Sequence, residues 1–361
     1  MRLRNPERLC PSAKSTDPQS WNAANPLMSL LHSIQTDLTA LAGEARKKLP
    51  AVKDAAERGL LKLRAIDEAK AHEYLIEDIG KAEEVVRACC LTADCKNAKV
   101  IGIAVGCSHK IVAHGAVSEK NVPLIIGLLV SQSDGGEEQT QLRVLQTALG
   151  LVGMDWPEST DVVKQSLEIC YRLQAGKSLT VGQAATATIR QIGSMIFDQC
   201  DASLKSCAAN TSSHTSMTST RLRICRLYLA DNIALATGEA TSWLVLRGDW
   251  RSLAVELLDH MLQSNTRVIV HEAEMAKIVR DNLCPMLLQP ARPKSAFPHV
   301  VRQLRLTVAC IRHLTAQLGD TSCKLVVTHA APAPRTRLSQ NRTCAVQRRL
   351  SCMAGACMTV A

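Results

Sequence analysis

The chain has 361 residues, of which 46% are hydrophobic and 21% charged, a balance typical of folded globular proteins rather than disordered chains. Only 2% are aromatic, which argues against β-sandwiches and barrels because these folds rely on Tyr, Phe and Trp. No apolar run approaches the roughly 18 residues of a membrane-spanning helix, and no apolar segment of a secretory signal follows the basic N-terminus. We therefore expect a helical protein of the cytoplasm.

The net charge of +10 lies mainly at the two ends of the chain. Residues 1–26 carry +2, and residues 321–361 carry +6 without any Asp or Glu, which leaves about +2 for the middle. A basic folded domain, the usual sign of a nucleic-acid-binding protein, is therefore not predicted, and we expect no nucleic-acid partner. The alternative is a nucleic-acid-associated helical-repeat protein that uses the basic tail.

Apolar residues recur every three or four positions along most of the chain, which predicts amphipathic helices in succession. A first helix from Leu27 to Leu41 is followed by a second that begins at Pro50 and buries Leu60 and Leu63. Further helical stretches are predicted over 79–90, 97–105, 122–130, 137–152, 162–173 and 180–197, and then from 222, 250, 278 and 297. A buried strand competes with helix only over 99–106. About ten or eleven helices predict an all-α armadillo- or HEAT-like solenoid, with a compact bundle as the alternative.

Three segments break the helical pattern. Residues 199–220 are rich in Ser, Thr, Ala and Asn, which predicts a flexible linker. Residues 1–26 are predicted to form a disordered arm. Residues 319–361 are predicted to form a disordered basic tail that contains cysteines.

The chain contains no sequence motif that predicts catalysis or a cofactor. Residues 175–178 read AGKS, the end of a phosphate-binding loop, but they follow a predicted helix and fit a helix C-cap better. His271, Glu272 and Glu274 resemble an acid–base group, yet their pattern is typical of a solvated helix face. We therefore expect no catalytic or cofactor-binding residue and no enzyme, a helical-repeat enzyme being the weakest alternative.

Thiol and imidazole groups gather between residues 89 and 114. They lack the paired C-x-x-C spacing of structural zinc sites, so we expect no metal ligands and interpret them as buried thiols and solvated histidines. Cys170, Cys225 and Cys310 occupy apolar helical positions, which favours a packing role. The group between 89 and 114 comprises Cys89, Cys90, Cys95, Cys107, His109 and His114.

One basic segment is the only candidate interaction site. Its cations could contact anionic lipid headgroups or a partner protein. The alternative is a solvated helix face, because Asp54 and Glu57 lie among these cations. In that case Arg46, Lys47 and Lys48, which follow a predicted helix end, compensate the dipole of that helix. The candidate residues are Arg46, Lys47, Lys48, Lys53, Arg58, Lys62 and Arg64.

Several segments resemble the MON-two family, a group of large Golgi and endosomal scaffolds related to the BIG and Sec-seven Arf exchange factors. The stretch from Leu30 to Ile66 is similar to the opening of these proteins. Three later segments agree in the same order: LRVLQTALGLVG (142–153), AATATIRQIGSMIFDQ (184–199) and DNLCPMLLQ (281–289). The resemblance covers about residues 27–318, whereas residues 319–361 resemble no part of the family.

The resemblance implies a helical dimerisation and cyclophilin-binding domain over 27–198 and the start of a homology-upstream region over 221–318. It implies a scaffold or adaptor without enzymatic activity in Golgi-to-endosome vesicle transport, because nothing in the chain resembles the exchange-factor catalytic domain. The partners implied are a second copy of the chain, a Dopey-type scaffold and an Arf-like small GTPase. The location implied is cytoplasmic, peripheral on trans-Golgi or endosomal membranes.

Overall fold

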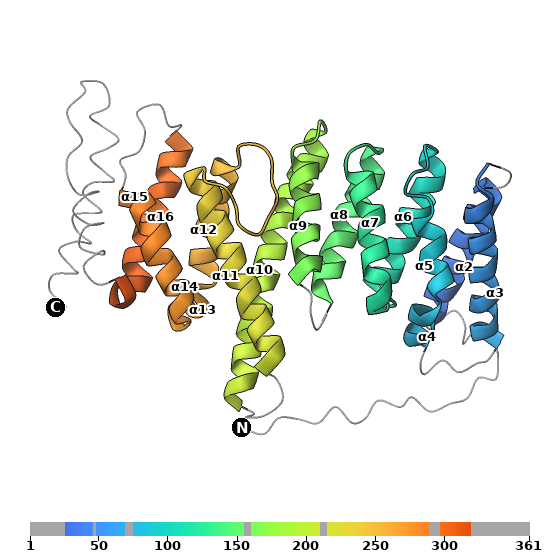
Figure 1. Ribbon diagram of the computed structural model, residues 1–361, viewed down its shortest axis with the longest axis horizontal. Helices are drawn as coiled ribbons and strands as arrows, with labels where there is room; N and C mark the ends of the chain where they lie inside the picture. Colours follow the sequence, from blue (N-terminus) through green and yellow to red (C-terminus); the bar gives the residue numbers. More distant parts are fainter. Residues whose placement is uncertain are drawn as a thin grey trace, which may run out of the picture. The chain divides into compact units, whose positions relative to one another are not determined.

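The computed structural model describes residues 26–45, 48–68, 75–154, 160–209, 215–288 and 297–318. These residues form helices and the turns between them, with no strand among them, so the all-α prediction is confirmed (Figure 1). Residues 1–25 of the arm predicted over 1–26 and the tail predicted over 319–361 lie outside the described residues, whereas Pro26 begins the first described helix. The chain divides into two compact units, the first ending at Leu128 and the second beginning at Leu129.

In the first unit, α2 (Pro26–Ala45) and α3 (Pro50–Glu68) form a helical hairpin. Pro50 is the first residue of α3, as predicted, because its missing N–H costs nothing in the first turn. Leu31, Ile34 and Leu38 of α2 and Leu63 of α3 are fully buried. A Cβ at Gly59 would lie 3.2 Å from Leu38 Cδ1, so this glycine allows close packing of α3.

A second layer of helices packs on this hairpin. It contains α4 (Leu75–Lys81), α5 (Glu83–Cys90) and α6 (Ala98–Ala113), and the chain then continues through the 3-10 turn η2 (Glu119–Asn121) into α7 (Val122–Ser133). The helix predicted over 79–90 is interrupted at Ala82, whose backbone is not helical. Residues 99–106 are helical and not a strand, since Asn97 caps α6 by accepting the Lys99 N–H at 3.1 Å.

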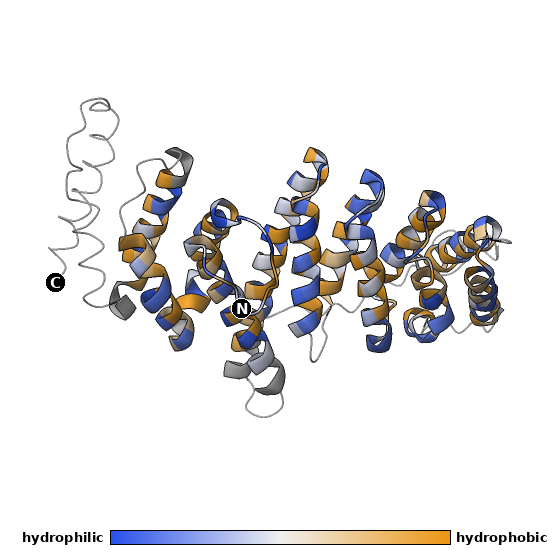
Figure 2. Cartoon of the chain, turned by 45° about the horizontal axis from the view of Figure 1, so that its top comes forward, coloured by the Kyte–Doolittle hydropathy of each residue, from blue (hydrophilic) through white to orange (hydrophobic). Residues whose placement is uncertain are grey.

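The second unit contains a succession of packed helices from α8 (Glu138–Gly153) and α9 (Thr160–Gln174) to α10 (Leu179–Ala209) and α11 (Thr215–Thr237). Consecutive helices pack on one another, and α10 also contacts α8 and α12 (Arg251–Ser264). Figure 2 shows hydrophobic and hydrophilic residues alternating along these helices, as expected when one face of each is buried.

The linker predicted over 199–220 is wrong for most of its length. Helix α10 continues to Ala209 and α11 begins at Thr215, so only 210–214 fall outside the described residues. Small polar residues lower helix propensity, but tertiary packing overrides it here because Cys200 and Ser203 are buried between α10 and its neighbours.

The end of the second unit consists of shorter helices. These are α13 (Thr266–His271), α14 (Ala273–Ile278), the π-helical turn η3 (Val279–Leu283) and α15 (Cys284–Leu288), followed by the long α16 (Phe297–Leu318). Glu256 of α12 pairs with Arg190 of α10 and with Arg302 of α16, the latter at 2.7 Å. One carboxylate therefore links three helices of this unit.

Candidate functional site

The predicted basic segment lies at the start of α3 and along its outer side. Lys53 pairs with Glu57 at 3.6 Å, and Arg58 pairs with Glu84 of α5 at 3.4 Å, so these two cations are partly neutralised. Lys48, Lys62 and Arg64 are exposed, and none of them makes an ion pair within the described part of the chain. Arg46 and Lys47 lie outside the described residues.

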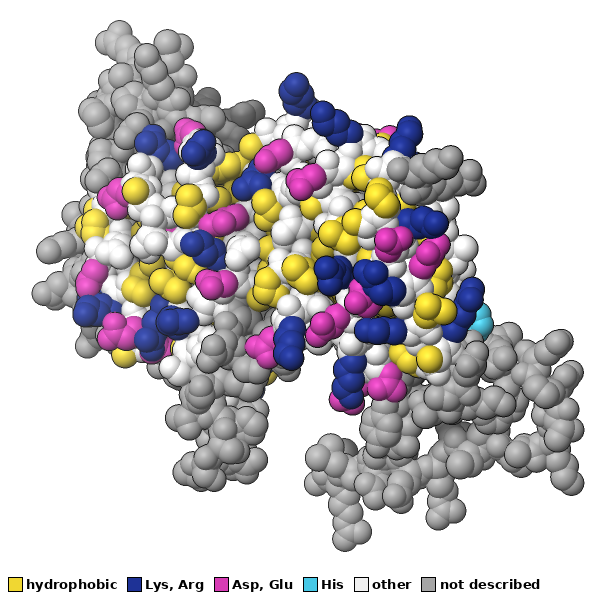
Figure 3. Space-filling view, turned by 45° about the vertical axis from the view of Figure 1, so that its right-hand side comes forward, with side chains coloured by type: hydrophobic (Ala, Val, Ile, Leu, Met, Phe, Trp, Pro, Cys, Tyr) yellow, Lys and Arg dark blue, Asp and Glu magenta, His cyan; other side chains and the backbone are white. Residues whose placement is uncertain are grey.

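An exposed leucine lies among the unpaired cations of α3. Leu61 is 65% exposed and is followed directly by Lys62, an arrangement of apolar and basic groups that suits a lipid surface or an acidic partner. The face drawn in Figure 3 is mixed in charge, because Lys and Arg are interspersed with Asp and Glu across it. The basic segment is therefore a small patch around Leu61, Lys62 and Arg64, and not a continuous basic surface.

A second candidate surface is the loop of residues 238–250 between α11 and α12, which sequence reasoning missed. Helix α11 ends at Thr237 and is followed by Gly238, whose φ of +81° is accessible to glycine at little cost. The N–H of Glu239 then bonds to the Ala234 carbonyl at 2.8 Å and that of Gly238 to the Leu235 carbonyl at 3.2 Å, the Schellman pattern of a helix end. The chain thus leaves α11 in a defined direction.

A buried carboxylate holds this loop in place. Asp231 of α11 is only 1% exposed, and it accepts the backbone N–H groups of Ser242 at 2.8 Å, Trp243 at 3.0 Å and Leu244 at 2.6 Å. The next residue, Val245, donates its N–H to Glu168 of α9 at 2.8 Å. Because four successive backbone donors are bonded to two carboxylates, the loop has a fixed conformation although it has no regular secondary structure.

The same loop buries Trp243 and exposes Val245, which is 74% exposed. Beside it a hollow of about 640 Å³ lies between α9 and α11, with Trp243 and Leu227 as its apolar lining. Lys164 and Arg223 supply two cations, and Arg223 donates to Thr160 Oγ1 at 2.7 Å. Because Asp161 lies in the same lining as these two cations and hydroxyl groups complete its polar part, the hollow is mixed in charge and favours no particular ligand.

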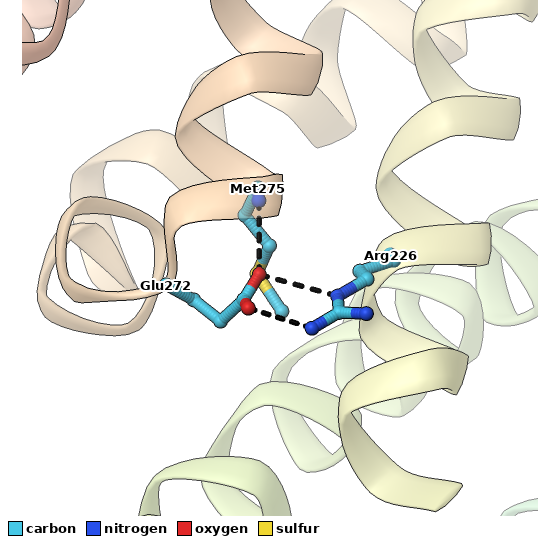
Figure 4. Close-up of polar contacts among 3 residues, drawn as sticks. All are labelled: Arg226, Glu272 and Met275. Carbon is cyan, nitrogen blue, oxygen red and sulfur yellow. Dashed lines mark hydrogen bonds and ion pairs between the residues drawn. The ribbon is translucent and has the colours of Figure 1, made fainter. Parts of the chain in front are cut away.

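The prediction of a solvated face for His271, Glu272 and Glu274 is wrong for Glu272. Its carboxylate receives two hydrogen bonds from Arg226 of α11, at 2.6 and 3.2 Å, and accepts the Met275 N–H at 3.0 Å (Figure 4). It therefore caps α14 and ties it to α11, a structural role. Glu274 is exposed, and the side chain of His271 lies outside the described residues.

The other motifs lie in structural positions. Residues 175–178 form the turn after α9, where Ser178 Oγ accepts the Val181 N–H at 3.3 Å and so caps α10. Cys89 and Cys107 are fully buried, as are Cys170, Cys225 and Cys310, which confirms their packing role. Burial raises the pKa of the Cys90 thiol to about 12. Within the described residues no group of three or more His, Cys, Asp or Glu side chains could hold a metal ion.

The described helices include none that is long and apolar enough to cross a membrane. The nucleic-acid alternative depends on the basic tail, which is outside the described residues. The geometry thus offers two surfaces for contacts with other molecules: the patch on α3 and the loop with its adjacent hollow.

Comparison with known proteins defines the class of this helical protein. Residues 26–203 match the model of the Mon2/Sec7/BIG1-like dimerisation and cyclophilin-binding domain, and residues 246–329 match that of the Mon2/Sec7/BIG1-like HUS domain. The two matches follow in order and span most of the chain. The chain therefore belongs to the Mon2/Sec7/BIG1-like family, in agreement with the resemblance of its sequence.

Curated relatives agree with this assignment. The chain is 26% identical over 333 residues to the Protein MON2 homolog of Xenopus laevis, covering 84% of this chain and 19% of the relative. The human Protein MON2 homolog is 26% identical over 330 residues, with 83% and 19% covered. The Monensin-resistant homolog 2 of Caenorhabditis elegans is 27% identical over 289 residues, with 76% and 17% covered. The chain thus spans about a fifth of the length of these relatives. No solved structure matches it significantly.

Proposed function

We propose that this chain is a scaffold or adaptor without enzymatic activity that acts in vesicle-mediated protein transport between the Golgi and endosomes. The observation that carries the proposal is the match of residues 26–203 to a domain described by dimerisation and cyclophilin binding. The matched regions contain no catalytic exchange-factor domain, which supports an adaptor rather than an exchange enzyme. In this proposal 27–198 is the dimerisation domain and 221–318 begins the homology-upstream region.

The partners proposed are a second copy of the chain, a Dopey-type scaffold and an Arf-like small GTPase. Contact with a trans-Golgi or endosomal membrane would be peripheral and would use the exposed patch on α3. Leu61 would enter the headgroup region while Lys62 and Arg64 meet anionic lipid, a contribution that salt weakens within a Debye length of about 10 Å at 0.1 M.

Flotation of the purified full chain tests recruitment. Liposomes of phosphatidylcholine with phosphatidylserine are offered with and without a GTP-loaded Arf-like GTPase. We expect flotation that depends on the GTPase, that falls as salt rises and that is weakened in a Lys62→Glu, Arg64→Glu double variant. Lys53→Glu is the matched control, since Lys53 is already paired with Glu57. Absence of flotation in both conditions would contradict membrane recruitment by this chain.

Sedimentation of the same full chain tests self-association separately. We expect a dimer at micromolar concentration and a monomer on dilution. A monomer at every concentration up to about 100 μM would contradict the dimerisation part of the proposal and leave the recruitment result standing.

A further inference from the structure

A third exposed surface lies on α7, and it carries no charge. The sequence of this helix, VPLIIGLLVSQS, contains no Asp, Glu, Lys or Arg, whereas each of the other described helices of more than eight residues carries at least one. The solvent-facing side of an amphipathic helix normally holds its charged residues. The outer face of α7 therefore differs in kind from the outer faces of the other long helices.

The accessible positions of α7 recur every three or four residues. Pro123, Leu124, Gly127 and Ser131 are exposed and Val130 is half-buried, while the positions between them are buried. Leu124 is 48% exposed. Residues at this spacing lie on one side of a helix, so these five form a single uncharged stripe, the α7 stripe.

A glycine lies at the centre of the α7 stripe. A Cβ at Gly127 would have no atom within 4 Å apart from the local backbone of its own helix, so packing within the chain does not require glycine here. Glycine also lowers the stability of a helix relative to alanine. What it provides is an open position where the backbone of a second helix can approach closely.

The two ends of the α7 stripe carry opposite charges. Lys120 lies seven residues before Gly127, and Asp134 lies seven residues after it. Lys120 is exposed and makes no ion pair within the described part of the chain. The Asp134 side chain is 70% exposed, and only its Oδ1 pairs with Arg172, at 3.4 Å, which leaves Oδ2 open to a second cation. The stripe thus ends in a cation on one side and in an accessible anion on the other.

We propose that the α7 stripe is the surface through which two copies of this chain associate, antiparallel about a two-fold axis beside Gly127. The inference rests on the self-association proposed above and adds the residues that form the contact. The matched domain that is described by dimerisation, residues 26–203, contains the whole stripe. In a two-fold pair both copies use the same surface, so a residue that precedes Gly127 faces the residue equally far beyond it in the second copy.

The α7 stripe is complementary to itself in this register. Leu124 packs against Val130 of the second copy, and Lys120 meets Asp134 of the second copy, each contact occurring twice. A second copy therefore fits the stripe better than a partner of unrelated sequence. The contact is short, because 14 helical residues span about 21 Å, so we expect a dimer that dissociates on dilution and weakens as salt screens its two ion pairs.

Sedimentation of the full chain with exchanged charges tests the register. Lys120→Glu and Asp134→Lys each place like charges opposite each other in a homodimer, so we expect either variant alone to dimerise about tenfold more weakly than the wild type. An equimolar mixture of the two variants restores both pairs of opposite charge, and we expect heterodimers with an affinity within about threefold of the wild type. Lys96→Glu, which changes an exposed cation in the turn before α6, is the matched control and should dimerise like the wild type.

Substitution of the central glycine tests the close approach. Gly127→Gln fills the middle of the stripe and should weaken dimerisation by about tenfold or more, without lowering the melting temperature, because glutamine has the higher helix propensity. Gly43→Gln in α2 is the matched control, since Gly43 is also exposed and helical and its Cβ would likewise meet no atom within 4 Å. This control should leave dimerisation unchanged.

The outcomes separate this surface from self-association as such. If the wild type dimerises and Gly127→Gln dimerises equally well, or if the mixed charge variants form no heterodimer, the α7 stripe is not the interface and the proposed self-association stands. A wild-type chain that stays monomeric up to about 100 μM contradicts the self-association itself and this inference with it.

Discussion

The α2–α3 hairpin of the first unit and the α11 region of the second are held together by different kinds of interaction. In the hairpin, the core is apolar and charges lie at its edge, where Lys99 pairs with Glu44 and Lys110 with Asp37, each at 2.6 Å. In the α11 region a carboxylate, Asp231, lies inside the core. The difference teaches that helix-on-helix packing needs only apolar faces, whereas a fixed non-helical segment needs buried acceptors for its backbone donors.

The largest expected effect comes from removing the buried acceptor. Asp231→Ala leaves three backbone N–H groups of the loop without their partner, so we expect a loss of about 3–5 kcal/mol in the free energy of unfolding, measured with urea. Glu239→Ala is the matched control in the same loop; its side chain is exposed and the change should cost less than about 0.5 kcal/mol. Equal effects of the two changes would mean that Asp231 does not hold the loop.

In the α2–α3 hairpin, truncation of buried apolar side chains should lower the free energy of unfolding. Leu63→Ala and Leu60→Ala each remove a buried side chain of α3 and should cost about 2–5 kcal/mol, measured by the same urea unfolding. Leu61→Ala, between them, removes a side chain that is 65% exposed and should change stability by less than about 0.5 kcal/mol. Wild-type stability of the Leu60→Ala, Leu63→Ala double variant would contradict the described packing of α3.

A smaller effect is expected at the half-buried ion pair of the second unit. Glu272→Gln keeps an acceptor for the Met275 N–H but loses the charge that meets Arg226, so we expect a loss of about 1–2 kcal/mol in thermal unfolding experiments. The exposed Glu274→Gln should be neutral. If Glu272→Gln were neutral as well, the interpretation of this segment as a solvated face would be restored.

The smallest effect on stability is expected at the exposed patch on α3, where substitutions should have the largest effect on membrane binding. The Lys62→Glu, Arg64→Glu variant used for flotation changes two exposed side chains and should shift the melting temperature by no more than about 2 °C. A large drop in melting temperature would show that these cations support the hairpin itself, and the flotation result could then no longer be assigned to the surface.

Periodicity of apolar residues was enough to predict the fold class and much of the core, including Leu60, Leu63 and the start of α3 at Pro50. It could not reveal the loop held by Asp231, because the bonds run from one side chain to backbone groups eleven to thirteen residues later. An aspartate inside the apolar run LYLADNIAL was the available signal. The composition of residues 199–220 led to the wrong prediction of a flexible linker for a related reason. Packing of α10 and α11 outweighs the low helix propensity of this segment.

The π-helical turn η3 sets the direction in which the side chains of α15 point. Its wider turn contains one residue more than an α-helical turn, which rotates α15 by about 100° relative to an uninterrupted α-helix. With this rotation Cys284 and Leu287 point into the interior, where both are fully buried, and α15 packs on α16. Deleting one residue from 279–283 would therefore turn this buried face toward water, whereas single substitutions at exposed positions of the turn would leave the rotation unchanged. The length of this segment is thus under a tighter physical constraint than the identity of its exposed residues.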